Sequence, residues 1–175
     1  MFKLRELERR DLETINKWRN NPELIQYLGA PFRYINLEVD VKWFEHYMAN
    51  RGSSIRCAIV QEDAENEILG LVSLTDIDFI NRSARLHIMI GEGRSQGKGL
   101  GTFAIKKMLE HAFYNMNLRR IELEVLATNE RAIHLYSKVG FQKEGLKRRA
   151  VYKSGAYQDE IIMGLLREEY DLQGG

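Results

Sequence analysis

Residues 88–102, IMIGEGRSQGKGLGT, lead from an apolar run through a turn with five glycines into an amphipathic helical pattern. Glycine lets the backbone approach a phosphate closely, and the first N–H groups of a following helix point at such an anion with the positive end of the helix dipole behind them. The spacing excludes two nucleotide-binding loops. A Walker loop needs glycine where this chain has Glu92, and neither glycine pair completes the fingerprint G-x-G-x-x-G. The pattern left is QGKGLG at residues 96–101, for which a plain glycine turn is the alternative to an anion site.

Length and composition are those of an ordinary globular protein. The 175 residues, 44% hydrophobic and 29% charged, are expected to form one domain over residues 1–170 and a disordered tail over 171–175. A formal net charge of +1 favours neither nucleic acid nor a membrane as a partner. The one cysteine, Cys57, excludes an intrachain disulfide and suits the cytoplasm, where we expect the protein. No apolar run reaches the roughly 18 residues of a membrane span.

Hydrophobic periodicity predicts an α+β fold. Strands are expected at residues 2–7, 55–61, 68–75, 84–90, 120–126, from 141 onward and at 157–166. Helices are expected at 12–20, 37–48, 100–114 and 130–139, with a short turn at 23–28. In the second helix the expected buried face is Leu37, Val41, Phe44 and Met48. The order β-α-α-β-β-β-α-β-α-β-β predicts a mixed, mostly antiparallel sheet of about seven strands flanked by four helices. Strand 120–126 should lie parallel to strand 84–90, because a helix connects them.

A second pattern follows about 28 residues after the glycine loop, NERAIHLYSKVGF at residues 129–141. It contains Asn-x-x-Ala, then tyrosine four residues after the alanine, then Gly-Phe. Together with the loop pattern Gln/Arg-x-x-Gly-x-Gly/Ala, it resembles the GCN5-related N-acetyltransferase (GNAT) family. The resemblance extends over essentially the whole chain, and both ends look like the branch with spermidine and ribosomal-protein N-terminal acetyltransferases. It implies the GNAT fold, acetyl-CoA as cofactor and N-acetyltransferase activity.

The resemblance also implies where coenzyme A binds. The glycine loop would hold the pyrophosphate, and the thioester arm would lie along the edge of strand 84–90, which a bulge splays from strand 120–126 in the family. Asn129 would contact the cofactor as well as cap its helix, although capping alone explains an asparagine there. The residues expected to contact coenzyme A are Ile88, Met89, Ile90, Arg94, Gln96, Gly97, Lys98, Gly99, Leu100, Gly101, Thr102 and Asn129.

Acetyl transfer to an amine needs a base for the amine and a proton for the departing thiolate. The resemblance gives Tyr136 the role of general acid, and a plain core tyrosine is the alternative. The base stays open among His87, Glu124, Glu122 and a water linked to them. Many relatives carry a glutamate early in the strand before the loop, where this chain has Arg85 and His87. An unperturbed histidine, with a pKa of about 6.5, can take a proton near neutrality.

The acceptor should lie over the first two helices and the 29–36 loop. Spermidine acetyltransferases carry two acidic residues before the proline of this loop, where this chain has Gly29 and Ala30. This difference argues against polyamines, and the segment Trp18-Arg19-Asn20 instead resembles acetyltransferases of nucleotide-linked amino sugars. The residues expected to bind the acceptor are Trp18, Arg19, Tyr27, Phe32 and Arg33.

We therefore expect an enzyme that moves acetyl from acetyl-CoA to a primary amine of a small molecule, such as an amino sugar, by direct attack in a ternary complex. A polyamine or a protein N-terminus is the alternative acceptor, and a non-catalytic acyl-CoA-binding module is the alternative from another class. The resemblance makes a homodimer plausible. No metal is expected, because three helical histidines lack partners at metal-binding spacing, namely His46, His111 and His134.

Overall fold

The computed structural model describes residues 1–91, 99–172 and 174. One seven-stranded sheet runs in the order β1-β2-β3-β4-β5-β7-β6, and its β4–β5 pair is parallel while the others are antiparallel. The strands are β1 (Phe2–Glu6), β2 (Ile55–Gln61), β3 (Ala64–Asp78), β4 (Ser83–Ile90), β5 (Arg120–Leu126), β6 (Gln142–Lys153) and β7 (Ala156–Leu166). The predicted α+β class and the mixed, mostly antiparallel sheet are confirmed.

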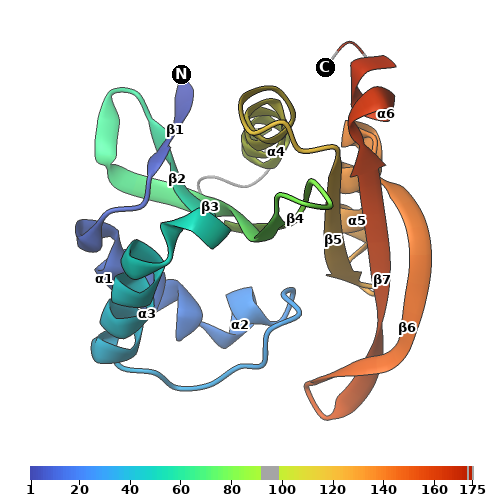
Figure 1. The fold of residues 1–175 in the computed structure, drawn as a ribbon. Helices are drawn as coiled ribbons and strands as arrows, with labels where there is room; N and C mark the ends of the chain where they lie inside the picture. Colours follow the sequence, from blue (N-terminus) through green and yellow to red (C-terminus); the bar gives the residue numbers. More distant parts are fainter. Residues whose placement is uncertain (92–98, 173, 175) are drawn as a thin grey trace.

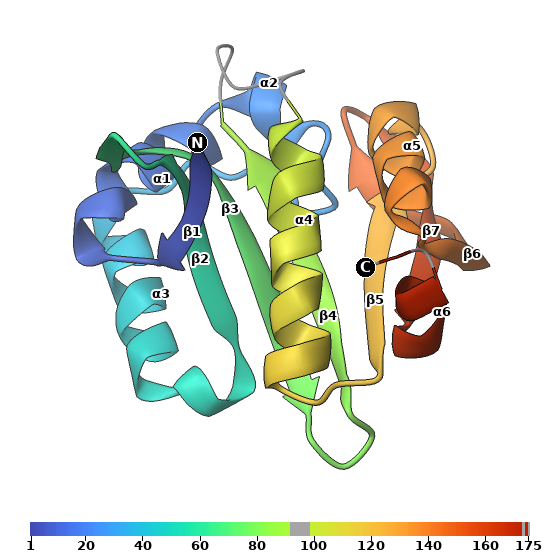
Figure 2. The same cartoon turned by 90° about the horizontal axis from the view of Figure 1, so that it is seen from above.

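Helices cover both faces of this sheet (Figures 1 and 2). The α-helices are α1 (Leu12–Arg19), α2 (Pro22–Ile25), α3 (Leu37–Ala49), α4 (Leu100–Glu110), α5 (Glu130–Val139) and α6 (Arg167–Leu172). Single helical turns occur at Arg9–Asp11, Arg51–Ser53 and His111–Asn115. One hydrophobic core lies between the sheet and α4 and α5, and a second one lies between the sheet and α1 and α3. None of the described helices is long and apolar enough to cross a membrane.

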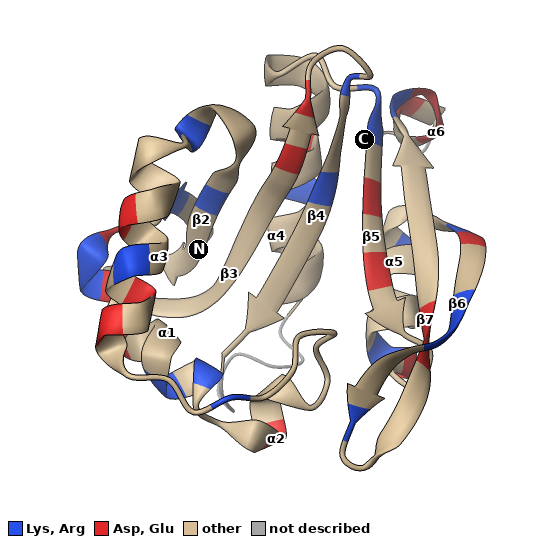
Figure 3. Cartoon of the chain, turned by 60° about the horizontal axis from the view of Figure 1, so that its bottom comes forward, with Lys and Arg blue, Asp and Glu red and all other residues tan. Residues whose placement is uncertain are grey.

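The sheet opens between its two parallel strands. β4 and β5 pair only where residues 83–85 meet residues 120–122, and beyond that point they diverge (Figure 3). On its other side β4 pairs with β3 without a register shift from Arg85 to Ile90, so the divergence does not require the bulge that we expected there. The second half of β4 therefore presents backbone groups toward the opening, as does the facing half of β5.

The buried face of α3 differs from the prediction. Asp40, Phe44 and Tyr47 are its buried residues, whereas Leu37 and Met48 are exposed. The carboxylate of Asp40, 0% exposed, accepts hydrogen bonds from Asn16 Nδ2 at 2.7 Å and from Arg19 Nη1. These partners satisfy the carboxylate and turn α3 so that an acidic residue faces inward.

The predicted disordered tail is wrong for its first two residues. Helix α6 continues to Leu172, and the hydroxyl of Tyr114 donates a hydrogen bond to Asp171 at 2.5 Å. Tyr170 is buried and packs on Phe113, with ring centroids 5.4 Å apart, which holds the helix against the core. Gln173 and Gly175 lie outside the described residues.

Candidate active site

A cavity of about 1400 Å³ occupies the opening between β4 and β5. Its walls come from both halves of the chain: α2 and residues 26–30 on one side, and the start of α4 together with α5 on the other. The floor is the second half of β4 and the residues of β5 that face it across the opening. Segments distant in sequence thus enclose a space in which two substrates can meet.

The α4 end of the cavity has the properties of an anion site. Gly99 adopts φ 77°, a conformation that favours glycine, and leads directly into the helix. The first hydrogen bond of α4 runs from the Phe103 N–H to the Gly99 carbonyl, so the N–H groups of residues 100–102 have no partner within the helix. Gly101 lies against α5, because an added Cβ would come within 3.0 Å of Leu135. The close helix packing keeps this end narrow.

Most of the expected coenzyme A residues line this cavity. They are Ile88, Met89, Ile90, Gly99, Leu100, Gly101, Thr102 and Asn129. Arg94, Gln96, Gly97 and Lys98 lie outside the described residues. Sequence reasoning missed a row of basic side chains on α5 that also lines the cavity, namely Arg131, His134 and Lys138. Their spacing of three and four residues places them on one helical face, and this signal was available in the sequence. The N–H groups at the start of α4 and this basic row fit a pyrophosphate, and the open edge of β4 fits an extended arm.

Tyr136 reaches the cavity from α5. Asn129 caps this helix by accepting a hydrogen bond from the Ala132 N–H, and Gly140 ends it at φ 115°. Tyr136 is only 8% exposed, and its ring packs on Phe141, with centroids 6.0 Å apart. Burial raises the pKa of Tyr136 to about 12. The hydroxyl therefore stays protonated at neutral pH and can donate a proton or a hydrogen bond inside the cavity.

His87 faces the cavity from β4. Its Nε2 lies 2.9 Å from the Thr75 hydroxyl on β3, which fixes the orientation of the ring. Burial, followed by the positive charges of Arg56 and Arg85, lowers the pKa of His87 below its ordinary value. The imidazole is therefore neutral at pH 7 and can accept a proton.

Glu124 on β5 and Glu160 on β7 form a carboxyl pair at the opposite wall. Burial favours the neutral form of Glu124, but hydrogen bonds with Lys147 and Glu160 outweigh it and lower the pKa of Glu124. Burial and the adjacent Glu124 raise the pKa of Glu160, which is 8% exposed. Glu124 is thus the ionised member of the pair. Sequence reasoning did not find Glu160, because only the pairing of β5 with β7 brings it here.

The predicted acceptor residues separate into two groups. Tyr27 lines the cavity, whereas Trp18, Arg19, Phe32 and Arg33 do not. Trp18 belongs to the core between the sheet and α1. The guanidinium of Arg19 pairs with the buried Asp40. Phe32 stacks edge-on against Tyr34, with centroids 5.1 Å apart. The pattern around Trp18 therefore reflects packing of α1 on the sheet and on α3.

Two hydrogen-bonded anchors hold the 25–30 segment over the cavity. Lys153 at the end of β6 is buried, and its Nζ donates to the carbonyl of Ile25 at 2.8 Å and to that of Ala30. Asn129 Nδ2 donates to the carbonyl of Tyr27 at 3.1 Å. Asn129 thus caps α5 and also links the start of this helix to the 25–30 segment, a contact that the sequence did not indicate.

Comparison with known proteins agrees with this geometry. A family model described as "Acetyltransferase (GNAT) domain" matches residues 2–142. The spermidine N(1)-acetyltransferase of Vibrio cholerae serotype O1 is 34% identical over 168 residues, which cover 95% of this chain and 94% of the relative. That of Escherichia coli (strain K12) is 32% identical over 170 residues, 96% of this chain and 87% of the relative.

Solved structures of an N-acetyltransferase also resemble this chain in fold. The crystal structure of the Vibrio cholerae spermidine N-acetyltransferase in complex with CoA and spermine matches with a TM-score of 0.89 and 31% identity over 97% of both chains. A dodecameric structure of the Vibrio cholerae spermidine N-acetyltransferase, in an intermediate state, matches with a TM-score of 0.83 and 31% identity, over 99% of this chain and 98% of that one.

Proposed function

Because the chain belongs to the acetyltransferase (GNAT) family, we propose that it transfers the acetyl group of acetyl-CoA directly to the primary amine of a small aliphatic molecule. N-acetyltransferase activity with acetyl-CoA as the cofactor follows from the family and from the full-length relatives. One observation carries the proposed direct transfer: the opening between β4 and β5 collects His87, Glu124 and Tyr136 in a single cavity. Cys57, the one thiol in the chain, does not line this cavity, which favours direct transfer over an acetylated cysteine.

The amine would be received between the two facing strands. Bound acetyl-CoA supplies a thioester whose carbonyl carbon the amine attacks and whose thiolate leaves. Glu124, the ionised carboxylate on β5, attracts the ammonium form of the acceptor. His87 on β4, neutral at pH 7, takes the proton that the amine must lose. The sequence left both residues open as the base, and their environments favour His87, because Lys147 already holds a hydrogen bond to Glu124.

Tyr136 would supply the proton for the leaving thiolate. Its buried hydroxyl is protonated, and it reaches the cavity from the helix that carries the basic row. General acid catalysis of this kind contributes roughly 10²–10⁴-fold. A plain core tyrosine remains the alternative role for this residue, and kinetics separate the two roles.

The acceptor class rests on the relatives. Two of them are spermidine N-acetyltransferases, which supports the polyamine alternative over the amino sugar favoured by our sequence interpretation. Spermidine and a simple diamine are thus the reference acceptors. Gly29 and Ala30, however, stand where spermidine acetyltransferases carry two acidic residues, so the likeness to those relatives does not extend to the carboxylates that would bind a polycation.

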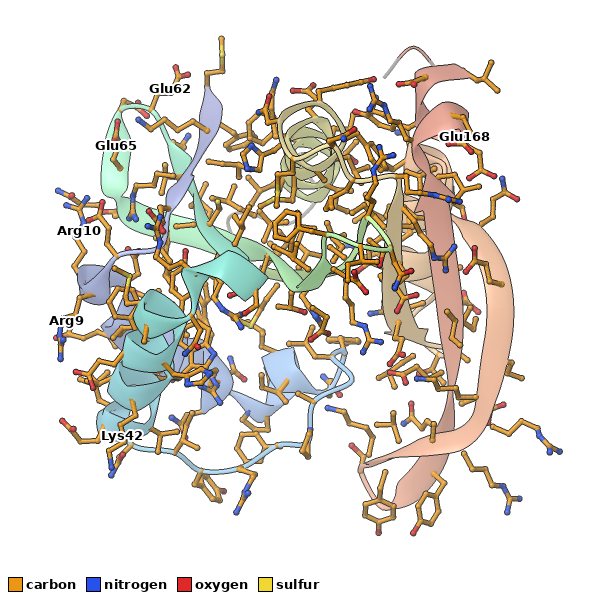
Figure 4. The ribbon with its side chains drawn as sticks, in the orientation of Figure 1. Arg9, Arg10, Lys42, Glu62, Glu65 and Glu168 are labelled. Atoms are coloured by element: carbon orange, nitrogen blue, oxygen red, sulfur yellow. The ribbon has the colours of Figure 1, made fainter. Side chains whose placement is uncertain are left out.

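Steady-state kinetics with Tyr136→Phe test the proposal. We expect kcat to fall roughly 10²–10⁴-fold, while the dissociation constant of acetyl-CoA, measured by calorimetry, changes little. Glu168→Gln is the matched control and should retain full turnover, because Glu168 is an exposed residue of α6 whose side chain points away from the cavity (Figure 4). Equal kcat in Tyr136→Phe and in the unaltered chain would remove the acid role. Acetyl-CoA binding without thiol release on any amine would instead favour the non-catalytic module.

We also propose that copies of this chain associate. A dodecameric structure is known for the Vibrio cholerae relative, so we propose an assembly of at least the two copies expected from the sequence. Light scattering coupled to size-exclusion chromatography measures the mass directly, and a single monomer peak across micromolar concentrations would contradict the proposal.

A further inference from the structure

A row of three side chains crosses the sheet toward the expected position of the amine. Arg56 on β2 pairs in register with Ser73 on β3, which in turn pairs with His87 on β4. Residues in register on adjacent strands project from the same face, so all three side chains point to one side of the sheet. All three line the cavity. Arg56 lies two strand spacings, roughly 10 Å, from His87.

Arg56 is a cation without an anionic partner in the described part of the chain. Its guanidinium lies over the rings of Trp43 and Tyr47, with its carbon 4.8 Å and 5.8 Å from their centroids. Its Nε is buried and has no hydrogen-bond partner. No carboxylate among residues 1–91 and 99–172 lies within ion-pair distance of it. Burial lowers the pKa of Arg56, and the attraction of Tyr47 and Asp76 offsets this only in part. The aromatic rings stabilise the charge partly, yet the donors on the guanidinium stay available to a ligand.

Arg85 provides the contrast on the same wall. It lines the cavity too, and its Nε is likewise buried without a hydrogen-bond partner. Its Nη2, however, lies 3.1 Å from Glu122 and 3.8 Å from Glu124, so its charge is compensated by ion pairs within the protein. A desolvated cation without a counter-charge is costly unless a partner arrives. Arg56 is therefore the cation in this wall that is placed to recognise something outside the chain.

Resting on the proposed function, we infer that the acceptor carries an anionic group, a carboxylate or a phosphate, in addition to its primary amine, and that Arg56 binds this group. The planar guanidinium presents two parallel donors to such an anion, and Trp43 and Tyr47 fix its plane. The amine then lies between His87 and Glu124, at the other end of the row. A polyamine would place a second ammonium near Arg56, where like charges repel.

Acceptors that differ only at the far end test this inference. 6-Aminohexanoate, hexylamine and 1,6-diaminohexane share one six-carbon chain and end in a carboxylate, a methyl group and an ammonium. 6-Aminohexyl phosphate distinguishes a phosphate from a carboxylate. We expect kcat/KM for the better of the two anionic acceptors to exceed that of hexylamine by roughly tenfold to hundredfold, the range of a charged hydrogen bond. We expect 1,6-diaminohexane and spermidine to be the poorest acceptors.

Substitutions of Arg56 test whether this residue causes the preference for an anionic acceptor. Arg56→Met keeps an aliphatic chain against Trp43 and should remove the anion preference while leaving the KM of acetyl-CoA unchanged. Arg56→Glu should reverse the preference in favour of the diamine. Arg9→Met is the matched control, because Arg9 lies exposed in the helical turn before α1, outside the cavity lining, where it pairs with Glu45 (Figure 4). Thermal unfolding of each variant establishes that it is folded.

The outcomes separate the two proposals. Equal or better use of hexylamine, the diamine or spermidine by the unaltered chain overturns the anionic acceptor, and so does an unchanged preference in folded Arg56→Met and Arg56→Glu. Either result leaves acetyl transfer to an aliphatic amine standing, because thiol release is still observed. Thiol release with none of these amines, despite acetyl-CoA binding, contradicts the proposed function and the inference with it.

Discussion

Replacing Gly91 with alanine tests how the end of β4 is packed. An added Cβ would lie 2.3 Å, 2.6 Å and 3.0 Å from three carbon atoms of the Trp18 ring. The indole is 6% exposed and enclosed in the core, and the Gly91 N–H is fixed by a 2.9 Å hydrogen bond to the Leu69 carbonyl. Neither side can move away freely. Overpacking of this kind costs about 1–3 kcal/mol of the free energy of unfolding, which for a chain of this size lowers Tm by roughly 2–12 °C.

A second substitution identifies the cause. The three clashing atoms all belong to the six-membered ring of the indole, so Trp18→Phe should vacate the space that the alanine methyl needs. Alone it should cost about 1–3 kcal/mol, as large-to-small core changes commonly do. In the double variant the two losses should not add, and the coupling should favour the pair by at least about 1 kcal/mol.

Urea unfolding of the four proteins in this cycle gives the measurement, with the KM of acetyl-CoA as a second readout. Unchanged stability in Gly91→Ala, or strictly additive losses in the double variant, would refute the packing argument.

Three further predictions concern the site and its support. The acidic limb of the pH profile of kcat/KM should lie below about pH 6.5, because burial and nearby cations lower the pKa of His87. His87→Gln should remove that limb. Because the pKa of His87 is lower in the folded than in the unfolded chain, its contribution to the free energy of unfolding is fully present above about pH 6.5 and is lost as the pH falls toward the folded pKa. Asp40→Ala should cost about 1–3 kcal/mol in urea unfolding, because it removes the buried carboxylate that pairs with the half-buried Asn16 and Arg19, and an unchanged midpoint would contradict this. Lys153→Met should raise the KM of the acceptor but not that of acetyl-CoA, since it releases the carbonyls of Ile25 and Ala30; equal effects on both constants would count against it.

The cofactor half was predictable because its signals are local. A glycine turn before a helix and an asparagine cap each depend on residues within a few positions of one another. The two motifs carry the resemblance to the GNAT family, and that resemblance predicted a coenzyme A site and a candidate acid without any knowledge of tertiary contacts. The parallel pairing of β4 with β5 followed from the helix between them.

The acceptor half was not predictable in this way. Trp18 looked like a binding residue by its neighbours in sequence, yet its ring packs against Gly91, 73 positions later. The inward turn of α3 depends on donors from α1 that satisfy Asp40, and no periodicity within α3 reports them.

The sequence by itself determined the family and, through the family, the cofactor, because the two motifs that carry the resemblance are short and continuous in the chain. Only the tertiary structure decided which charged side chains line the cavity. Strand register brings Arg56 into one row with His87, and β7 brings Glu160 beside Glu124. Strand pairing joins residues across long stretches of chain, and burial then sets their charge, so neither property is present in the order of residues alone.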